Sequence, residues 1–390
     1  MLYNRRPWSG MRHITARPAL ATALCLAAIG CGGGNSQLSS YAEFAQFVTT
    51  TIDQAQTAPD LPPSICVAIG RRGAPFYTHC VGNAALAPRV AASPETVYQI
   101  ASLSKQFTAA AIMQLNTVNP PAVSLDGLLT DYVPQMDSHP AITIRELLNH
   151  TTGLFEYTNL PQADEWGESG VTPDEFVAAL VPTPQVFMPE SAFQYCDTNY
   201  YFLGLIIQAA SGDAYDNYLR QQFFDPFKLS FTGYGPVLGV LNAAGYKLGP
   251  GQTLVPAEKV DVSALFASGG LSSNVLDLVK WDWLLLGGSI LPQAAVEQMI
   301  TPSGVPDYST GIPSTYGFGL FSERIYHRRL VSHTGAVSGF FGFNATFTDD
   351  GWSIALLTNI DVDDDPQITN LGPKIIKAVC RPDSYFRNWC

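Results

Sequence analysis

The chain reads Tyr98-Gln99-Ile100-Ala101-Ser102-Leu103-Ser104-Lys105-Gln106-Phe107 at the point where an apolar run ends in a serine and a helical pattern begins. Ser102 and Lys105 are three positions apart, so a helix brings both side chains to one face. The next residues, 109–113, are apolar on every side, which predicts a buried helix and a partly buried lysine. Burial makes a lysine a better proton acceptor, so the pair has the outline of an activated serine nucleophile.

The same residues have a simpler interpretation. Ser102 could be only the N-cap of the helix, with Lys105 extending to water. Of the seven lysines in the chain, Lys105 alone has a serine three residues before it. The choice between the two interpretations depends on partner residues further along the chain.

Length and composition limit the classes of protein. The chain has 390 residues, of which 46% are apolar and 14% charged, enough for a sizeable core in one large domain or two interleaved ones. The formal net charge of −12 argues against nucleic acid or anionic lipid as partners. Beyond the first thirty residues, no segment is apolar enough to predict a transmembrane span.

The first 31 residues predict an export signal. Four arginines precede the apolar run Ala19–Ile29, which is too short to span a bilayer. The run closes on Ala28-Ile29-Gly30-Cys31 and three glycines, which resembles a bacterial lipoprotein cleavage site with Cys31 as the lipidated residue. We therefore expect a signal over 1–31, a tether over 32–39, and an exported protein that is periplasmic or anchored by lipid. Ordinary cleavage and secretion is the alternative.

Export makes disulfides plausible. Cys66 and Cys80 lie in two strand-like runs on either side of Arg71-Arg72-Gly73-Ala74, and folding about that turn predicts a bridge between them. Cys380 and Cys390 could close a small C-terminal loop. Neither the cysteine spacing nor the histidine spacing matches a metal site, so we expect no metal.

The middle of the chain is predicted to be mainly helical. Thr143-Ile144-Arg145-Glu146 is a capping box that opens a helix through His150. We interpret His150-Thr151-Thr152-Gly153 as a polar helix end rather than as a catalytic motif. A helix running to Gly212 and another over Ser272–Leu286 follow.

After Pro313 the hydrophobic period changes to that of strands. We predict four strands and a closing helix, with a hairpin turn at 349–351: Gly317–Phe321, Arg329–Gly335, Phe340–Thr348, Trp352–Thr358 and the helix Lys374–Cys380. Strands at both ends with helices between them predict an α+β fold. Its antiparallel sheet comes from the N- and C-terminal segments, and a mainly helical domain is inserted.

Two further stretches decide between the interpretations of Ser102. Tyr195-Cys196-Asp197 starts a helix, and Ser332-His333-Thr334-Gly335 lies on a predicted strand. With Ser102 and Lys105 they match, in order and spacing, the three motifs of active-site serine penicillin-recognising enzymes. The flanking stretches 142–154 and 268–273 agree. The chain resembles the class C β-lactamase family, which includes DD-carboxypeptidases, D-aminopeptidases and related esterases, over about residues 40 to 378.

The resemblance implies a β-lactamase/transpeptidase-like fold. Its sheet parts would be about 40–100 and 262–378, its helical part about 101–261, and 379–390 would be a tail. It implies that Ser102 forms an acyl-enzyme while Lys105 and Tyr195 manage the proton, with Tyr195 as a phenolate base held by the lysine. No cofactor is implied.

The third motif supplies the remaining implied roles. The N–H groups of Ser102 and Ala336 would form the oxyanion hole. His333, Thr334 and Gly335 would line the substrate side.

The chain departs from the family pattern at two places. The middle motif usually ends in Asn, where this chain has Asp197, and it has Cys196 before it, which we expect to pack rather than react. An ionised Asp197 near Lys105 would favour the Tyr195 phenolate, so Asp197→Asn should move the acidic limb of kcat/KM to higher pH. The third motif of β-lactamases starts with Lys, where this chain has His333, which we expect to be neutral near its titration point.

These features predict a monomeric serine hydrolase acting on small esters, peptides or β-lactams. Without a lysine at position 333, and with Asp197 beside the pocket, we expect at most slow β-lactam hydrolysis. The absence of Gly-x-Ser-x-Gly argues against an α/β-hydrolase. The alternative is a catalytically silent protein of the same fold that binds penicillin or peptides.

Overall fold

The structure is a computed structural model and describes residues 41–56, 62–325, 327–361 and 366–380. Several predictions concern residues outside these ranges: the export signal 1–31 with Cys31, the tether 32–39, and Cys390 with the tail beyond position 380. None of the described helices is long and apolar enough to cross a membrane.

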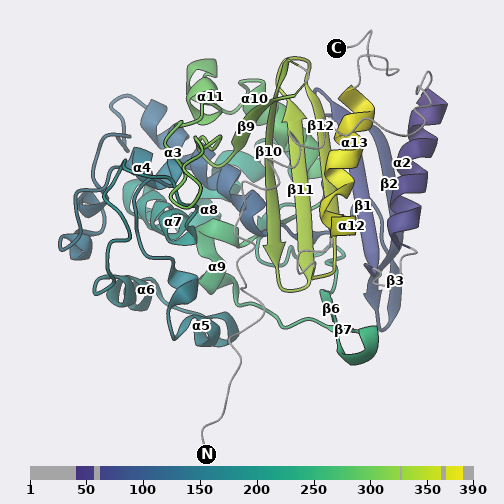
Figure 1. The fold of residues 1–390 in the computed structure, drawn as a ribbon, viewed down its shortest axis with the longest axis horizontal. Helices are drawn as coiled ribbons and strands as arrows, with labels where there is room; N and C mark the ends of the chain where they lie inside the picture. The colour runs from purple at the N-terminus through teal and green to yellow at the C-terminus, as the bar shows by residue number, and fades with distance from the viewer. Residues whose placement is uncertain (1–40, 57–61, 326, 362–365, 381–390) are drawn as a thin grey trace, which may run out of the picture.

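A seven-stranded antiparallel sheet forms the centre of the molecule (Figure 1). Its strand order is β3-β2-β1-β12-β11-β10-β9, so the N-terminal strands join the C-terminal ones where β1 pairs with β12. This arrangement confirms the predicted fold class. The strands are β1 (Ser64–Arg71), β2 (Ala74–Leu86), β3 (Arg89–Ala91), β9 (Phe321–Ile325), β10 (Arg328–Val337), β11 (Phe340–Phe347) and β12 (Trp352–Thr358).

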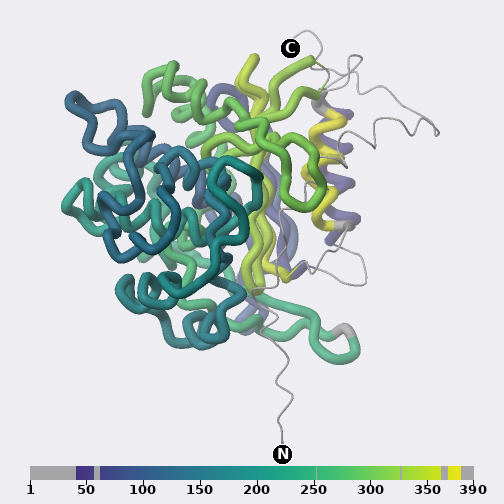
Figure 2. The backbone as a smooth tube through the Cα atoms, turned by 60° about the vertical axis from the view of Figure 1, so that its left-hand side comes forward, coloured from purple at the N-terminus to yellow at the C-terminus, as the bar shows by residue number. Residues whose placement is uncertain are grey.

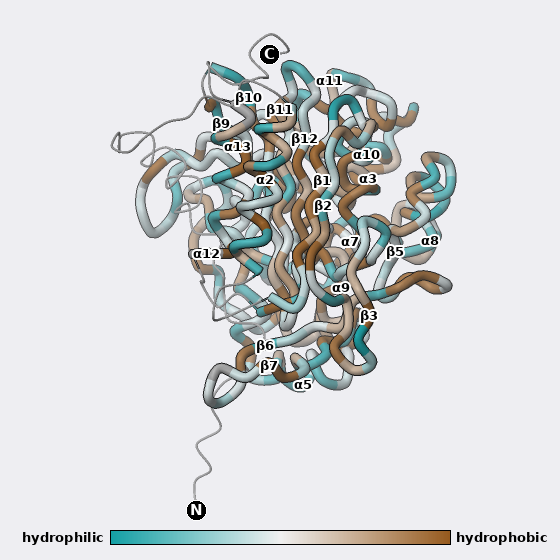
Figure 3. Tube along the Cα trace, turned by 90° about the vertical axis from the view of Figure 1, so that its right-hand side faces the viewer, coloured by the Kyte–Doolittle hydropathy of each residue, from teal (hydrophilic) through white to brown (hydrophobic). Residues whose placement is uncertain are grey.

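Helices cover both faces of the sheet. On one face, Ile65, Val67 and Ile69 of β1 pack in a core with α2 (Tyr41–Gln56) and α13 (Leu371–Cys380). The alternate residues Cys66 and Ala68 belong to a second core that includes α10 (Val275–Leu286). Because neither face meets water, the central strands are mostly apolar, and much of β1 and β12 is brown in Figure 3.

The chain between β3 and β9 contributes most of the helices, which gather on one side of the sheet (Figure 2). They are α3 (Lys105–Thr117), α4 (Ile144–Asn149), α5 (Ala163–Ser169), α6 (Pro173–Leu180), α7 (Asp197–Ser211), α8 (Tyr215–Leu219), α9 (Val262–Gly269) and α11 (Gln293–Met299); α12 (Pro366–Thr369) precedes α13. Short strands join them: β4 (Tyr98–Gln99), β5 (Gly233–Tyr234), β6 (Tyr246–Leu248), β7 (Leu254–Pro256) and β8 (Leu271–Ser273). Single turns are η2 (Ala101–Ser104), η3 (Leu129–Asp131), η4 (Pro134–Met136), η5 (Tyr157–Asn159), the π-helical η6 (Arg220–Phe224) and η7 (Pro250–Gln252).

Two predicted elements are confirmed by their local contacts. The Glu146 N–H donates to Thr143 Oγ1 at 3.2 Å and the Thr143 N–H donates to Glu146 Oε2 at 2.6 Å, which is the predicted capping box of α4. Cys66 and Cys80 lie directly opposite each other on β1 and β2 and form the predicted disulfide. Both features depend on residues close in sequence, which explains why pattern alone predicted them.

Two predicted elements are wrong in their extent. Ser272 and Ser273 are strand, not helix, because β8 pairs with β4 and β5; α10 begins only at Val275. The predicted strand Gly317–Phe321 is mostly loop, and the strand β9 begins at Phe321. A Cβ added to Gly319 (φ 76°) would lie 2.7 Å from the Lys105 carbonyl oxygen, so this loop packs directly on α3.

Candidate active site

The predicted nucleophile lies in a sharp turn between β4 and α3. Ser102 is in the 3₁₀ turn η2, and Lys105 is the first residue of α3. Ala101, the residue before Ser102, has φ 45°, a conformation that a non-glycine residue rarely adopts. Hydrogen bonds to Leu271 of β8 hold the turn: Ile100 N–H donates to the Leu271 carbonyl at 3.0 Å, and Leu271 N–H donates to Ser104 Oγ at 3.0 Å.

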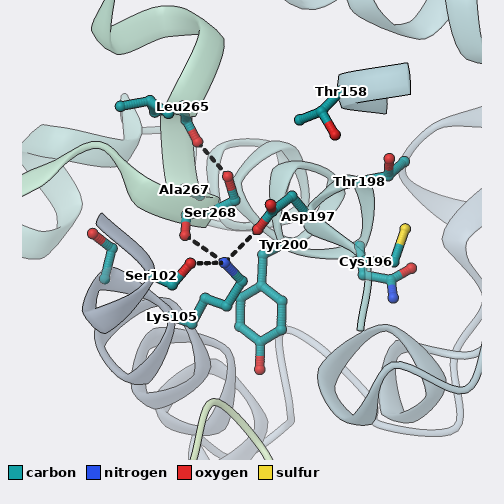
Figure 4. A network of polar contacts seen from close by, with 12 residues as sticks. Ser102, Lys105, Thr158, Cys196, Asp197, Thr198, Tyr200, Leu265, Ala267 and Ser268 are labelled. Carbon is teal, nitrogen blue, oxygen red and sulfur yellow. Dashed lines mark hydrogen bonds and ion pairs between the residues drawn. The ribbon is translucent and has the colours of Figure 1, made fainter. Parts of the chain in front are cut away.

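The Lys105 ammonium joins three elements at one point (Figure 4). Its Nζ donates to Ser102 Oγ at 2.9 Å, to Asp197 Oδ1 at 2.5 Å and to the Ser268 carbonyl at 2.7 Å. The Lys105 side chain is completely buried. Three acceptors match the three protons of an ammonium group, so the contacts fit the charged form of the lysine.

Tyr195 lies beside this lysine but does not share in the hydrogen bonds. Lys105 Nζ lies 4.9 Å from the centre of the Tyr195 ring, and Tyr195 Oη is buried with no partner at hydrogen-bonding geometry. Burial and then the Asp197 carboxylate hold the pKa of Tyr195 well above its ordinary value, although the nearby Ser102 hydroxyl acts in the opposite direction. Burial, with the Asp197 charge as a second cause, therefore disfavours the expected phenolate of Tyr195.

A second carboxylate, which the sequence analysis missed, lies next to Asp197. The Asp197 N–H, at the start of α7, donates to Glu156 Oε2 at 2.6 Å. Asp197 remains 28% exposed and Glu156 is half-buried. Nothing in the spacing of Glu156 marks it, because it approaches the motif only in three dimensions.

His150 contacts the middle motif, Tyr195-Cys196-Asp197, and the helix that follows it. Its Nδ1 accepts from the Cys196 N–H at 3.2 Å and from Asn199 Nδ2 at 3.1 Å, and its ring centre lies 4.4 Å from that of Tyr195. Cys196 is buried, and burial raises the pKa of its thiol well above the ordinary value, so it packs as expected. His150 is thus a buried positioning residue at the end of α4.

His333 is buried and does not line an open pocket. Its Nδ1–H donates to the Thr334 carbonyl at 2.5 Å, so Nε2 is the acceptor, and Tyr316 Oη donates to it at 3.2 Å. Burial and the Lys105 charge lower the pKa of His333 to about 3. His333 is therefore neutral, as expected, but its burial against Tyr316 moves its pKa away from the expected titration point.

The end of β10 is an open sheet edge beside Ser102. β9 pairs with β10 only as far as Ser332, which leaves Thr334 and Ala336 half-buried along the edge. A Cβ added to Gly335 would lie 2.1 Å from the Ile100 carbonyl oxygen and 3.1 Å from the Ser102 nitrogen. Val337 and Phe340 close a two-residue hairpin, and hydrogen-bonded pairs alternate along a ladder, so the Ala336 N–H points away from β11 toward this edge.

The site has no candidate metal ligands among the residues that the structure describes: no group of three or more His, Cys, Asp or Glu side chains is placed to hold an ion. Its chemistry is that of a serine hydroxyl, a lysine, a tyrosine and convergent backbone N–H groups.

A serine–lysine pair at the start of a buried helix, beside the unpaired end of β10 in an antiparallel sheet, defines the β-lactamase/transpeptidase-like fold class. The chain belongs to the Beta-lactamase family, whose model matches residues 50–371. It is 27% identical over 267 residues to the protein named PbpX of Bacillus subtilis (strain 168), covering 68% of this chain and 62% of that one. It is 28% identical to a D-aminopeptidase of Brucella canis, covering 71% of this chain and 52% of that one.

Among solved structures, the octameric penicillin-binding protein homologue from Pyrococcus abyssi has a TM-score of 0.72 and 26% identity, over 85% of this chain and 75% of that one. The chain spans only about half to three-fifths of the curated relatives it matches. The match to the family model therefore assigns the chain to the family. The activities named for the curated relatives are those of longer proteins.

Proposed function

We propose that this hydrolase forms an acyl-enzyme on Ser102 and hydrolyses small esters or amides. The observation that carries the proposal is the contact of Lys105 Nζ with Ser102 Oγ, made by a fully buried lysine that Asp197 and Ser268 hold in place. Burying a charge is costly even when it is paired, and this charge lies where a proton carrier beside a nucleophile is needed.

The proposed reaction has two similar halves. In the first, Ser102 Oγ attacks the carbonyl carbon while its proton passes to the Lys105–Tyr195 set, and the new oxyanion accepts hydrogen bonds from the Ser102 and Ala336 N–H groups. The carbonyl re-forms as the bond to the leaving group breaks, and the leaving group takes the proton. Water then attacks the ester by the same route and releases the acid and Ser102.

The charges at the site favour substrates without a carboxylate near the scissile bond. Lys105 is paired with the Asp197 carboxylate, Glu156 lies beside Asp197, and His333 is neutral. Without a cation at position 333, and with carboxylates beside the nucleophile, the site disfavours the carboxylate that most β-lactams carry and tolerates esters, amides and free ammonium groups. We therefore propose esterase or aminopeptidase-like amidase activity with slow β-lactam turnover, which agrees with the similarity to a D-aminopeptidase.

Covalent labelling tests the proposal. A fluorophosphonate should label the purified protein at one site, and Ser102→Ala should abolish the labelling with an unchanged circular dichroism spectrum. Cys196→Ser is the matched control, because its thiol is buried and should not react. Labelling that persists in Ser102→Ala, or no labelling at all, would instead support the silent binding protein.

A substrate panel tests the specificity. It should contain a short-chain ester, a D-amino acid amide, a D-Ala-D-Ala peptide and a chromogenic cephalosporin. We expect the ester or the amide to give the highest kcat/KM. A cephalosporin well above both would show that the site charges do not control substrate choice.

Export, lipidation of Cys31, the Cys380–Cys390 bridge and a monomeric state also remain proposals. They rest on the sequence patterns described above. Mass spectrometry of the mature N-terminus and of non-reduced peptides, with light scattering of the purified protein, tests all four.

A further inference from the structure

We propose that Asp197 sets the pH range of the enzyme by holding a proton on Lys105, the group that must receive the Ser102 proton. The inference rests on the proposed acyl-enzyme function of Ser102. It makes Asp197 a positioning residue that acts through the lysine rather than on the substrate.

The geometry around Lys105 Nζ supports the proposal. All three of its hydrogen-bonding directions are taken by acceptors: Ser102 Oγ, Asp197 Oδ1 and the Ser268 carbonyl. An amine can accept the Ser102 proton only after it has lost one of its own. Of the three acceptors only Asp197 carries a charge, and an anion 2.5 Å away stabilises the ammonium form.

The other groups that face the lysine do not offset this effect. They are two tyrosine rings and two buried histidines: Tyr195, Tyr200, His150 and His333. His333 would oppose the lysine charge if it were protonated, but burial and the lysine itself keep it neutral. Glu156 accepts from the Asp197 N–H and so lies next to the carboxylate, not next to a cation that would offset it. The conclusion holds if Tyr195 is the base instead, because Asp197 also raises the pKa of Tyr195.

The proton balance follows from the same contacts. Lys105 must give up one of the three Nζ protons that it donates before it can accept another. The neutral Nζ then accepts the Ser102 proton as the new C–O bond forms, and it passes this proton to the leaving group as the scissile bond breaks. Asparagine, which the family usually has at this position, would accept the same hydrogen bond without the charge.

The experiment compares pH profiles of kcat/KM for the wild type and Asp197→Asn, on an uncharged ester that does not itself titrate. We expect the acidic limb of Asp197→Asn to lie about one pH unit or more below that of the wild type. This is the reverse of the direction expected from sequence. Asp197→Glu keeps the charge, and its limb should stay close to that of the wild type.

A limb that is unmoved in Asp197→Asn, or one that moves to higher pH, would overturn the role of Asp197. Equal shifts in Asp197→Asn and Asp197→Glu would also overturn it, because geometry rather than charge would then be responsible. Fluorophosphonate labelling at alkaline pH separates this outcome from failure of the proposed function. Labelled Ser102 with an unmoved limb refutes only the role of Asp197, whereas an unlabelled wild type refutes the hydrolase itself.

Discussion

At the scale of single residues, removing the buried hydroxyl of Tyr195 should affect catalytic activity and folding stability in opposite directions. Tyr195 Oη has no hydrogen-bond partner, and a buried unpaired hydroxyl costs roughly 1–3 kcal/mol. Tyr195→Phe should therefore have an equal or higher melting temperature. Loss of a proton-transfer group should nevertheless lower kcat/KM by about 100-fold or more.

Thermal melts and steady-state kinetics of the same Tyr195→Phe preparation check this prediction. Cys196→Ser, one residue away and also buried, serves as the control and should change kcat/KM little. A Tyr195→Phe variant with unchanged kcat/KM would show that Lys105 manages the proton without the tyrosine.

The identity of the site residues was predictable, whereas their ionisation was not. Ser102, Lys105 and Tyr195 belong to short motifs whose order and spacing are visible in the chain, and the structure brings all three together. The ionisation of Tyr195 depends on its burial and on the nearby Asp197 charge, and both follow from the folded structure. Glu156 and Tyr316 also act through contacts between distant segments, so no local pattern could reveal them.

At the scale of secondary-structure elements, β10 must approach η2, the turn that carries Ser102, without a side chain between them. Gly335→Ala would place a methyl carbon 2.1 Å from the Ile100 carbonyl, so the strand must move away from η2. Displacing an oxyanion donor costs about 100-fold to 1000-fold in kcat, and we expect a loss of this size. Gly233→Ala is the control, since its nearest contact is a side-chain methyl of Val237 at 3.3 Å.

Measuring kcat for both glycine variants checks this. Similar, small losses in the two variants would mean that the approach of β10 to Ser102 is not required for oxyanion binding.

The contact between α10 and β11 contains a buried acid with neutral partners. Asp282 accepts from Asn344 Nδ2 at 2.9 Å and from Thr346 Oγ1 at 2.8 Å, and burial raises its pKa to about 7. In the unfolded chain this carboxyl ionises near pH 3.9. Between these values the unfolded state releases a proton that the folded state keeps, so stability falls as pH rises, by up to about 4 kcal/mol above pH 7.

Asp282→Asn keeps an acceptor oxygen and removes the carboxyl group whose ionisation lowers the stability at high pH. We expect the variant to be more stable than the wild type at pH 8, with a smaller difference at pH 4.5, in urea unfolding. Asp126→Asn, at an exposed carboxylate in a surface ion pair with Arg145, is the control and should follow the wild type to within about 1 kcal/mol. A constant difference between Asp282→Asn and the wild type at both pH values would contradict the assignment.

The extent of the elements was predicted best where contacts are local. The capping box of α4 and the β1–β2 hairpin need only neighbouring residues, and both are present. Ser272 and Ser273 fit a helical pattern but pair with Tyr98, Gln99 and Gly233, which lie far away in sequence. Tertiary pairing overrode local preference there.

At the scale of the whole molecule, net charge should influence substrate capture. The chain carries a formal charge of −12, and two carboxylates, Asp197 and Glu156, lie beside the nucleophile. An amino acid amide with a free ammonium should lose at least about twofold in kcat/KM between about 10 mM and about 1 M salt, as the Debye length falls from about 30 Å to about 3 Å. A neutral ester measured in parallel should change little; equal losses for both substrates would exclude steering.

The pairing of β1 with β12 means that the sheet is not assembled in the order of synthesis. Ile65 lies opposite Thr358, so the first hairpin of the sheet emerges from the ribosome long before its neighbour does. Until then β1 presents an unpaired apolar edge, the kind of surface that aggregates or recruits chaperones. The Cys66–Cys80 bridge lies wholly within this early hairpin. In an oxidising compartment the bridge could fix the register of β1 and β2 first. The last strand to be synthesised, β12, would then pair with a hairpin that is already aligned.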